Sequence, residues 1–575
     1  MPRKSFVFKV AGAAGEGILS TGLLFSKIAA RSGCYIFDYN EYPSLITGGH
    51  NTYLVHFSHK SVYCQSPKTD ILLALNTDAL KMHIEELSPD SVVIYDNEVI
   101  KNPIEEFNLP AKILTLPMKR LAEEAGGKEL MANNVGVGAA AYLAGFSLET
   151  ANAIVAEVFA DKDIKIIETD QKAASSGYNQ AKSQIQSQLL KEKTQGVSFQ
   201  TMTGNEAVAL GAIAGGLQFY AGYPMTPSST ILHFMAKNAQ NAGIVVKQAE
   251  DEISVISMAI GASFAGARAM VGSSGGGFSL MVESLGLAGI TELPLVVFEG
   301  TRPGPALGLP TWTDQGDLRF VLHAGNGEFP RIVLAPSDAQ EAFELSRRAQ
   351  ILAETFQMPV IVLSDKYLAE SRYCVDISEE EFTNSRFGIE HNPKPDQTGF
   401  FPRYRPDLPV SPRTIPGTPG GIYIANADDH DQYGFSAEEA DVRIAQVNKR
   451  NKKLDLVRLE IPKQYWEEEP GANLTLISFG STKGAIQEAR ELFSLEGIKT
   501  NHLNLSWIWP FPKVQVEEVI QKFKNVIVVE GNSHRQLAGL IAQETGFIAK
   551  HNLNKYDGRP FYAKDIENYV KNFKE

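Results

Sequence analysis

The chain has 575 residues, more than one ordinary domain, and its 43% hydrophobic and 21% charged residues are typical of a protein that buries large cores. Its formal net charge of -13 argues against nucleic acid or an anionic membrane as the main partner. No apolar stretch approaches the roughly 18 to 20 residues of a membrane span, and no signal-peptide pattern is present, so we expect a cytoplasmic protein.

The cysteines exclude one class of site. Cys34, Cys64 and Cys374 are scattered, without any Cys-x-x-Cys pair. The chain alone therefore cannot hold a four-thiolate iron–sulfur cluster or zinc site. Unpaired thiols fit a reducing compartment better than a disulfide scaffold.

A glycine-rich turn follows the first expected strand at 6–10. This turn, Gly12-Ala-Ala-Gly15-Glu-Gly17, leads into a helix and exposes backbone N–H groups that suit a phosphate. A second glycine pair, Gly48-Gly49, precedes the expected strand at 52–57. Either turn could instead serve only to pack its neighbours closely. Further strands at 71–75 and 91–95 complete an expected α/β domain at 1–185.

Residues 171–200 are rich in Gln, Lys and Ser and poor in large apolar side chains. We interpret this segment as connecting chain, with a linker at 186–200 before the next domain.

Strands and helices then alternate regularly, from the capping-box spacing of Thr203-Gly-Asn-Glu206 onward. Strands expected at 218–222, 244–248, 268–272, 293–298, 331–334 and 360–363 predict a doubly wound parallel sheet at 201–375. Such sheets bind ligands beyond the carboxyl ends of their strands. Polar features follow four of these strands and are expected to meet at one edge: Thr226, Glu252, the loop Ser273-Ser274-Gly-Gly-Gly277 and Arg302.

Eight prolines between 393 and 419 exclude a helix or a central strand there and predict an arm or lid at 376–455. Within it, Asp428-Asp-His430-Asp431 could bind a metal ion, although an acidic turn that caps a helix fits better. A last α/β domain is expected at 456–575, with strands at 474–479 and 526–529 and a glycine turn at 480–484.

These segments together resemble one family. Tyr223-Pro-Met-Thr-Pro-Ser-Ser229 is similar to the Tyr-Pro-Ile-Thr-Pro-Ser-Ser signature of the 2-oxoacid:ferredoxin oxidoreductases. Further matching segments follow in the family's order: Gln248-Ala-Glu-Asp-Glu-Ile253, Gly300-Thr-Arg-Pro-Gly-Pro305, Leu309-Pro-Thr311, Gln315-Gly-Asp-Leu318, Gly480-Ser-Thr-Lys-Gly484, Pro510-Phe-Pro512 and Glu530-Gly-Asn532. The resemblance implies an α/β protein with a gamma-type domain fused ahead of an alpha subunit. The alpha part would contain a pyrimidine-binding domain and a transketolase-C-like domain.

The resemblance also implies an activity and partners. Such enzymes use thiamine diphosphate to decarboxylate a 2-oxoacid oxidatively, giving acyl-CoA and CO2, with electrons passing to ferredoxin. The chain has no Gly-Asp-Gly motif. The chain also lacks the four clustered cysteines that would hold an iron–sulfur cluster. The resemblance therefore implies that the diphosphate-binding residues, Mg²⁺ and a [4Fe-4S] cluster lie on a separate beta subunit, in an (αβ)2 heterotetramer.

The resemblance assigns roles to the residues at the predicted edge. Glu252, nine residues before Gly261, would share a proton with the pyrimidine N1′, and we prefer it to Glu250. Arg302 would hold the 2-oxoacid carboxylate, and Thr226 would touch substrate or cofactor. Each of the three also has a purely structural explanation. Glu252 could be a carboxylate at a helix N-terminus, Arg302 a surface arginine, and Thr226 a hydroxyl bonded within its own turn. The remaining assignments are cofactor contacts at Tyr223, Pro224 and Ser274, and coenzyme A contacts at Gly12, Gly15, Gly17, Gly48 and Gly49.

Some positions depart from the family. The chain has Gly304-Pro-Ala306-Leu307-Gly308 where Gly-Pro-Ser-Thr-Gly is usual. If these residues line the substrate pocket, it is more apolar than usual, which argues against 2-oxoglutarate without excluding it. The open substrates are therefore 2-oxoglutarate, pyruvate and a more apolar 2-oxoacid.

Two other functions stay open from the sequence. A self-contained thiamine lyase or transketolase-like enzyme would be active as a single chain. A non-catalytic subunit that binds coenzyme A or a nucleotide would keep the complex active without Glu252.

Overall fold

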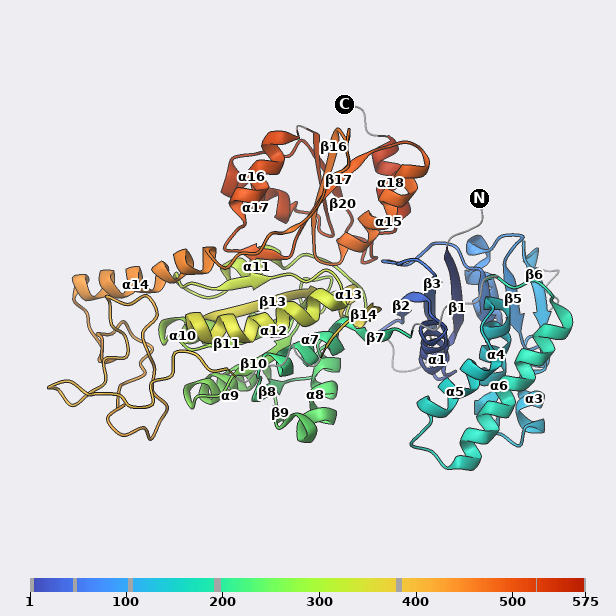
Figure 1. The fold of residues 1–575 in the computed structure, drawn as a ribbon, viewed down its shortest axis with the longest axis horizontal. Coiled ribbons are helices and arrows are strands. Elements are labelled where there is room, and N and C mark those ends of the chain that lie inside the picture. Colours follow the sequence, from blue (N-terminus) through green and yellow to red (C-terminus); the bar gives the residue numbers. More distant parts are fainter. Residues whose placement is uncertain are drawn as a thin grey trace. The chain divides into compact units, whose positions relative to one another are not determined.

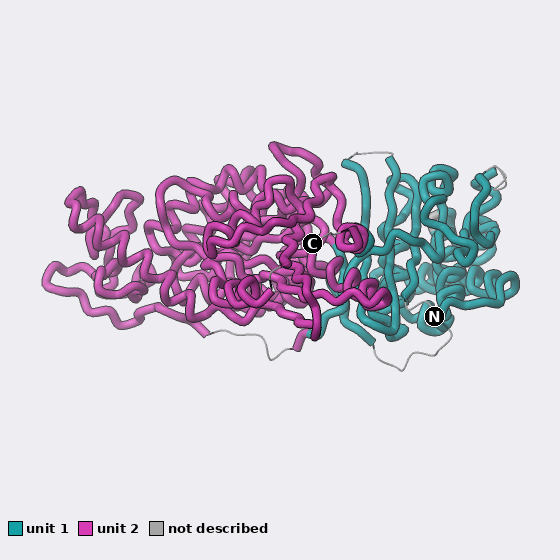
Figure 2. Tube along the Cα trace, turned by 90° about the horizontal axis from the view of Figure 1, so that it is seen from above, with its two compact units in different colours: residues 1–202, 371–376, 562–564 teal, residues 203–370, 377–561, 565–575 magenta. Residues whose placement is uncertain are grey.

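The computed structural model describes residues 5–44, 49–101, 107–190, 198–378, 385–523 and 525–572. The chain forms two compact units (Figure 2). Unit 1 contains residues 1–202, 371–376 and 562–564, and unit 2 contains the rest. No helix in the described ranges is long and apolar enough to cross a membrane.

Unit 1 is built on a mixed sheet (Figure 1). Its described strands lie in the order β6-β5-β4-β1-β3-β2-β14-β7, parallel from β6 to β1 and antiparallel at the β1–β3, β3–β2 and β2–β14 pairs. Bulky apolar strand residues and the helices beside them form one buried core. The strands are β1 (Ser5–Ala13), β2 (Tyr35–Glu41), β3 (His50–Ser58), β4 (Ile71–Ala74), β5 (Val92–Tyr95), β6 (Lys112–Thr115), β7 (Gln200–Thr203) and β14 (Arg372–Val375), and the helices are α1 (Ile18–Arg31), α2 (Thr77–Met82), α3 (Met118–Glu124), α4 (Ala132–Ala144), α5 (Leu148–Val158) and α6 (Ile164–Gln184).

Helix α6 corrects the interpretation of residues 171–184 as connecting chain. Its buried stripe consists of small residues, including Ala173 and Gly177, rather than large apolar ones. A Cβ at Gly177 would overlap the carbonyl of Val135 in α4, so the two helices pack in close backbone contact. A polar, small-residue helix of this kind has little of the apolar periodicity that marks a helix in a sequence.

The larger sheet of unit 2 has the strand order β18-β12-β13-β11-β10-β8-β9 in the described residues. All of its pairs are parallel except β12–β18, which confirms the predicted doubly wound parallel sheet. The predicted capping box is also confirmed, between Thr203 and Glu206 at the start of α7. The elements are α7 (Gly204–Ala214), β8 (Phe219–Gly222), α8 (Ser229–Ala242), β9 (Val245–Gln248), α9 (Glu252–Phe264), β10 (Ala269–Ser273), α10 (Gly275–Ile290), β11 (Leu295–Thr301), α11 (Leu318–His323), β12 (Ile332–Leu334), α12 (Ala339–Phe356), β13 (Pro359–Asp365), α13 (Lys366–Glu370) and β18 (Trp507–Trp509).

The C-terminal part of unit 2 forms a smaller sheet in the order β15-β17-β16-β19-β20 among the described strands. Strand β18 leaves this part and pairs with β12, and one apolar core extends over both sheets. These elements are α14 (Ala440–Arg458), β15 (Tyr465–Glu467), β16 (Leu474–Phe479), α15 (Thr482–Leu495), β17 (Thr500–Leu505), α16 (Lys513–Lys522), β19 (Asn525–Glu530), α17 (Gln536–Thr545), β20 (His551–Asn554) and α18 (Ala563–Lys571).

The proline-rich arm lacks helices and strands over its described residues 385–439, as predicted. It ends earlier than expected, because α14 begins at Ala440 within the predicted 376–455 segment. Buried ion pairs attach α14 to the parallel-sheet domain: Lys449 and Lys453 both contact the carboxylate of Glu292, at 2.5 and 2.6 Å.

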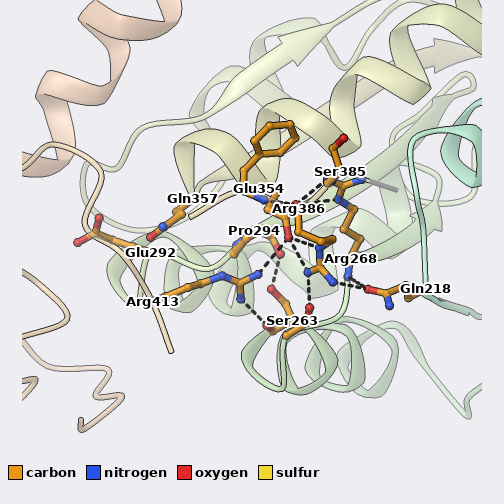
Figure 3. A network of polar contacts seen from close by, with 12 residues as sticks. Gln218, Ser263, Arg268, Glu292, Pro294, Glu354, Gln357, Ser385, Arg386 and Arg413 are labelled. Atoms are coloured by element: carbon orange, nitrogen blue, oxygen red, sulfur yellow. Dashed lines mark hydrogen bonds and ion pairs between the residues drawn. The ribbon is translucent and has the colours of Figure 1, made fainter. Parts of the chain in front are cut away.

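A second buried network attaches the start of the arm (Figure 3). Glu354 of α12 accepts hydrogen bonds from Arg268 and Arg386, each through Nε and Nη2, and lies 3.6 Å from Arg413. Arg413 also donates to the carbonyl of Ser263 near the end of α9. The arm is therefore joined to the same helix that begins at Glu252.

Candidate functional site

The predicted site residues follow four neighbouring strands of the larger sheet of unit 2. The chain passes from β8 outward to β9 and then returns to β10 on the other side of β8. A doubly wound sheet forms its ligand crevice at such a switch point, beyond the carboxyl ends of the strands. Thr226 follows β8, Glu252 follows β9, Ser274 follows β10 and Arg302 follows β11.

Glu252 is the first residue of α9 and is only 3% exposed. The preceding Asp251 caps the helix by accepting a 2.7 Å bond from the Ser254 N–H, so the Glu252 side chain is not needed as the cap. Its Oε1 lies 3.4 Å from the donor Oγ of Ser273. A Cβ at Gly277 would overlap both of these oxygens. Only glycine at 277 therefore lets α10 approach the carboxyl group this closely.

Arg302 lies against the turn that follows β8. Its guanidinium is buried and donates through Nη1 to the carbonyl of Thr226, at 2.8 Å. Burial lowers the pKa of Arg302 from its ordinary value, although an arginine stays protonated. The buried Asn205 holds the same turn by donating to the carbonyl of Pro227, at 2.7 Å. Arg302 and the turn thus form one wall of the site.

The outer part of the turn faces solvent. Tyr223 and Pro224 are exposed and Thr226 is half-buried. Ser274, in contrast, is fully buried, and its Oγ has no hydrogen-bond partner among the residues the structure describes. It precedes the first turn of α10 without capping it. A buried hydroxyl without a partner is costly, so this group suits a polar atom of a ligand.

The sequence interpretation missed a set of carboxyl groups beneath this edge. Glu299 of β11 is fully buried and lies beside Ser273 in the strand register. Asp314, Asp317 and Asp365 lie near it, and burial raises the pKa of each of the four. The sequence contained one sign of these carboxyl groups: Glu299 is an acidic residue inside an otherwise apolar parallel strand, which is unusual for a buried position.

The glycine turn of unit 1 is only partly free to bind a phosphate. The carboxylate of Glu16 accepts from the Ala13 N–H at 2.6 Å and from Asn76 at 2.9 Å. This carboxylate takes the place that an anion would occupy at Ala13. Gly15 and Gly17 instead line a cavity of about 620 Å³ in unit 1.

The other glycines assigned to coenzyme A are placed as follows. Gly12 is buried, Gly49 is exposed at the start of β3, and Gly48 lies outside the described residues.

Two further predictions concern loops of unit 2. Residues 304–309 are exposed, with Leu307 at 65%, so Ala306 and Leu307 lie on a rim rather than inside a pocket of this chain. The acidic turn does not cap α14, whose N-cap is Glu439. His430 is buried and bonds the Asp428 carbonyl at 2.9 Å. Within the described ranges, no group of three or more His, Cys, Asp or Glu side chains is arranged to hold a metal ion.

Comparison with family models matches three parts of the chain. Residues 7–180 match "Pyruvate ferredoxin/flavodoxin oxidoreductase". Residues 210–449 match "Pyruvate flavodoxin/ferredoxin oxidoreductase, thiamine diP-bdg". Residues 472–566 match "Pyruvate:ferredoxin oxidoreductase core domain II".

Comparison with whole proteins gives matches over nearly the full length. The chain is 31% identical to the 2-oxoacid:ferredoxin oxidoreductase 2 subunit alpha of Aeropyrum pernix, over 98% of this chain and 97% of that one. It is 30% identical to the 2-oxoglutarate oxidoreductase subunit KorA of Mycobacterium tuberculosis, over 99% and 91%. A solved 2-oxoglutarate:ferredoxin oxidoreductase from Magnetococcus marinus, with 2-oxoglutarate, coenzyme A and succinyl-CoA bound, matches with a TM-score of 0.91 and 31% identity over 99% of both chains. The chain therefore belongs to the 2-oxoacid:ferredoxin oxidoreductase family, among its alpha subunits.

Proposed function

We propose that this chain is the alpha part, with a fused gamma-type domain, of an enzyme that converts a 2-oxoacid and coenzyme A to acyl-CoA and CO2. The observation that carries the proposal is the buried carboxyl of Glu252 at the switch point of the parallel sheet, in the region matched by the thiamine diphosphate-binding family model. The five-part division predicted from the sequence, 1–185, 186–200, 201–375, 376–455 and 456–575, is part of this proposal.

The site residues fit the pyrimidine half of thiamine diphosphate. Ser274 offers a buried hydroxyl without a partner among the described residues, and Gly277 keeps the space beside Glu252 free of a side chain. Glu252 would hold a proton at N1′ of the pyrimidine ring, and Tyr223, Pro224 and Thr226 would contact the cofactor from the opposite turn. When bound, the cofactor supplies the carbon nucleophile and takes up the charge left by loss of CO2.

Arg302 would bind the substrate. A guanidinium has five N–H donors, and one bond to the Thr226 carbonyl leaves others for the paired oxygens of a 2-oxoacid carboxylate. The bond to Thr226 fixes the direction of the planar group in advance, so little freedom is lost when substrate binds. Thr226 would place its hydroxyl beside the same carboxylate.

The other half of the site would belong to a partner. Exposed apolar side chains lie on α9, on α10 and on the two loops that follow β8 and β11, the elements that carry the site residues: Tyr223, Ile253, Met258, Leu280 and Leu307. An exposed apolar rim of this kind marks a protein–protein contact. The sequence has no Gly-Asp-Gly motif and only scattered cysteines. We therefore assign the residues that bind the diphosphate, the Mg²⁺ ion and a [4Fe-4S] cluster to a beta subunit. The two subunits would form an (αβ)2 heterotetramer that reduces ferredoxin.

The substrate class is a 2-oxoacid. The similarity to the Magnetococcus marinus enzyme supports 2-oxoglutarate. Ala306 and Leu307 lie on the exposed rim and not in a pocket of this chain, so they no longer argue for pyruvate or a more apolar 2-oxoacid. For coenzyme A we keep the glycine turns of unit 1, with Gly15 and Gly17 at the 620 Å³ cavity as the better-placed pair.

The test compares Glu252→Gln with Glu250→Gln in the assembled complex. Glu250 is an exposed glutamate two residues earlier and serves as the matched control. Loss of the proton-sharing carboxyl is expected to lower 2-oxoacid-dependent ferredoxin reduction by at least roughly a hundredfold, and the control should keep full activity. Full turnover with Glu252→Gln would instead favour a non-catalytic subunit. Activity of the isolated chain with Mg²⁺ and thiamine diphosphate would favour a self-contained thiamine enzyme.

A further inference from the structure

The loop that follows Arg302 is exposed but has a defined backbone. Residues 304–309 are exposed, whereas Pro303 at the start of the loop is buried. Ala306 has a φ of 57°, in the left-handed region that alanine rarely adopts, and Gly308 has a φ of 50°. A backbone strained in this way persists only where its surroundings over-determine it. Because the middle of the loop faces solvent, the contacts that fix it must lie at its ends.

Both ends of the loop meet one glycine of the C-terminal part of unit 2. Gly558 is buried in the loop that follows β20 and has a φ of 79°. A Cβ at this glycine would lie 3.1 Å from Cδ1 of Leu309, 3.4 Å from Cβ of Trp312 and 3.7 Å from Cγ of Pro303. The Leu309 N–H donates to the Pro303 carbonyl at 3.0 Å, which closes the base of the loop. Gly558 therefore packs on this closed base.

Two further contacts join the same segments. The guanidinium carbon of Arg559 lies over the ring of Trp312, 3.2 Å from its centroid. The Thr313 N–H donates to the carbonyl of Gly558 at 3.2 Å. The Asp557 carboxylate accepts from the Arg559 N–H at 2.9 Å, which stabilises the loop after β20 itself. The base of the loop after Arg302 is thus attached to the C-terminal part by packing, by a hydrogen bond and by a cation–π contact.

This attachment reaches Arg302 through a single residue. Arg302 is the first residue after β11, and the attached Pro303 follows it directly. A proline allows little rotation about its own N–Cα bond. The backbone of Arg302 therefore lies between the end of a buried strand and an attached proline, while the Thr226 carbonyl fixes its guanidinium at 2.8 Å.

We propose that Gly558 and Arg559 form a positioning element for Arg302. By fixing the base of the loop, they keep the guanidinium in one orientation toward the carboxylate of the 2-oxoacid. A looser attachment lets Arg302 sample other orientations, which weakens substrate binding and leaves the later steps unchanged. Neither Arg559 nor Trp312 touches the substrate in this arrangement. The inference rests on the proposed role of Arg302.

The test removes each half of the cation–π contact in the assembled complex. Arg559→Ala and Trp312→Leu should each raise the KM for the 2-oxoacid about threefold, the factor that an exposed cation–π contact typically contributes. The kcat and the KM for coenzyme A should stay unchanged. Arg559→Lys keeps a cation over the ring and should restore the KM of the wild type. Arg458→Ala is the matched control, because it removes an exposed arginine of α14.

A double variant separates the contact from simple electrostatics. Removal of a positive charge also weakens the binding of an anion by itself, and that effect would add to the loss of the Trp312 ring. If Arg559 and Trp312 act through each other, the combined variant Arg559→Ala/Trp312→Leu should have the same KM as either single variant. Additive increases would overturn the proposal.

Hydrogen exchange of the full chain gives a readout that does not need activity. The N–H groups of Leu309, Trp312 and Thr313 are all hydrogen-bonded at the base of the loop. Their exchange should be about threefold faster in Arg559→Ala than in the wild type, and unchanged in Arg458→Ala. Unchanged exchange in Arg559→Ala would overturn the attachment. Faster exchange with an unchanged KM would overturn the positioning role.

Glu252→Gln distinguishes failure of this inference from failure of the proposed function. Full turnover in that variant refutes the proposed function, while the exchange rates still test the attachment. An inactive Glu252→Gln together with an unchanged KM in Arg559→Ala leaves the proposed function intact and refutes the positioning role. Arg559 is exposed, so its alanine variant should fold and decides the outcome even if Trp312→Leu does not assemble.

Discussion

Glu354 is the centre of the buried network that joins the arm to the parallel-sheet domain (Figure 3). Burial alone would raise the pKa of its carboxyl, but the hydrogen bonds of Arg386 and the charge and hydrogen bonds of Arg268 hold it below the ordinary value. Glu354→Gln keeps the shape and removes the charge. It leaves two cations, Arg268 and Arg413, only 1% and 2% exposed and without their carboxylate.

The expected cost follows from this burial. Breaking a buried ion pair by removing one partner destabilises a protein by about 3–5 kcal/mol. Arg386 is partly exposed and can regain water, so we expect about 4 kcal/mol, equivalent to a fall in Tm of roughly 5 °C for a unit of this size.

Differential scanning calorimetry of the full chain measures this change. Glu344→Gln is the matched control, because Glu344 lies on the same helix, is exposed and should change the Tm by less than about 2 °C. A fall of that small size in Glu354→Gln would refute the reasoning. It would mean that hydrogen bonds to carbonyls, such as that of Arg413 to Ser263, are enough to stabilise the buried arginines without the Glu354 carboxylate.

Three other predictions concern the site, the rim and unit 1. Gly277→Ala places a Cβ against Glu252 and Ser273, so kcat should fall by at least tenfold and the Tm should also fall, and unchanged kcat would contradict the geometry. Met258→Asp should abolish copurification of an iron–sulfur partner, whereas Met82→Asp, at a more exposed methionine of unit 1, should not. Burial, together with the charge of its neighbour His83, lowers the pKa of His50 to about 4. The free energy of unfolding of the full chain should therefore fall as the pH drops from 6.5 to 4, and His50→Asn should flatten that slope in urea titrations.

Local chemistry let the sequence predict most elements of the larger sheet. The parallel strands of unit 2 are short apolar runs bounded by turn residues, and their order along the chain predicts the sheet. The capping box of Thr203 and Glu206 is a purely local pattern, and the structure shows both of its bonds. The convergence of Thr226, Glu252 and Arg302 also followed from the sequence, because carboxyl ends of parallel strands meet at one edge.

Other elements of the fold depended on contacts between distant residues. Helix α6 is stable because small residues pack against α4, and its sequence alone resembles connecting chain. Strand β18 finds its partner in β12, about 170 residues earlier, so no local pattern could place it.

The same limit applies to the site. The sequence indicated Glu252 and Arg302 as separate candidates, but it could not show that Arg302 is held by the Thr226 carbonyl or that Ser274 is buried without a partner among the described residues. Nor could it show that Glu299 is fully buried beside Ser273, since the two lie on different strands. Residue type and spacing determined which chemistry the chain can offer. Tertiary packing determined which of these groups meet and which are buried, because both depend on contacts between residues far apart in the sequence.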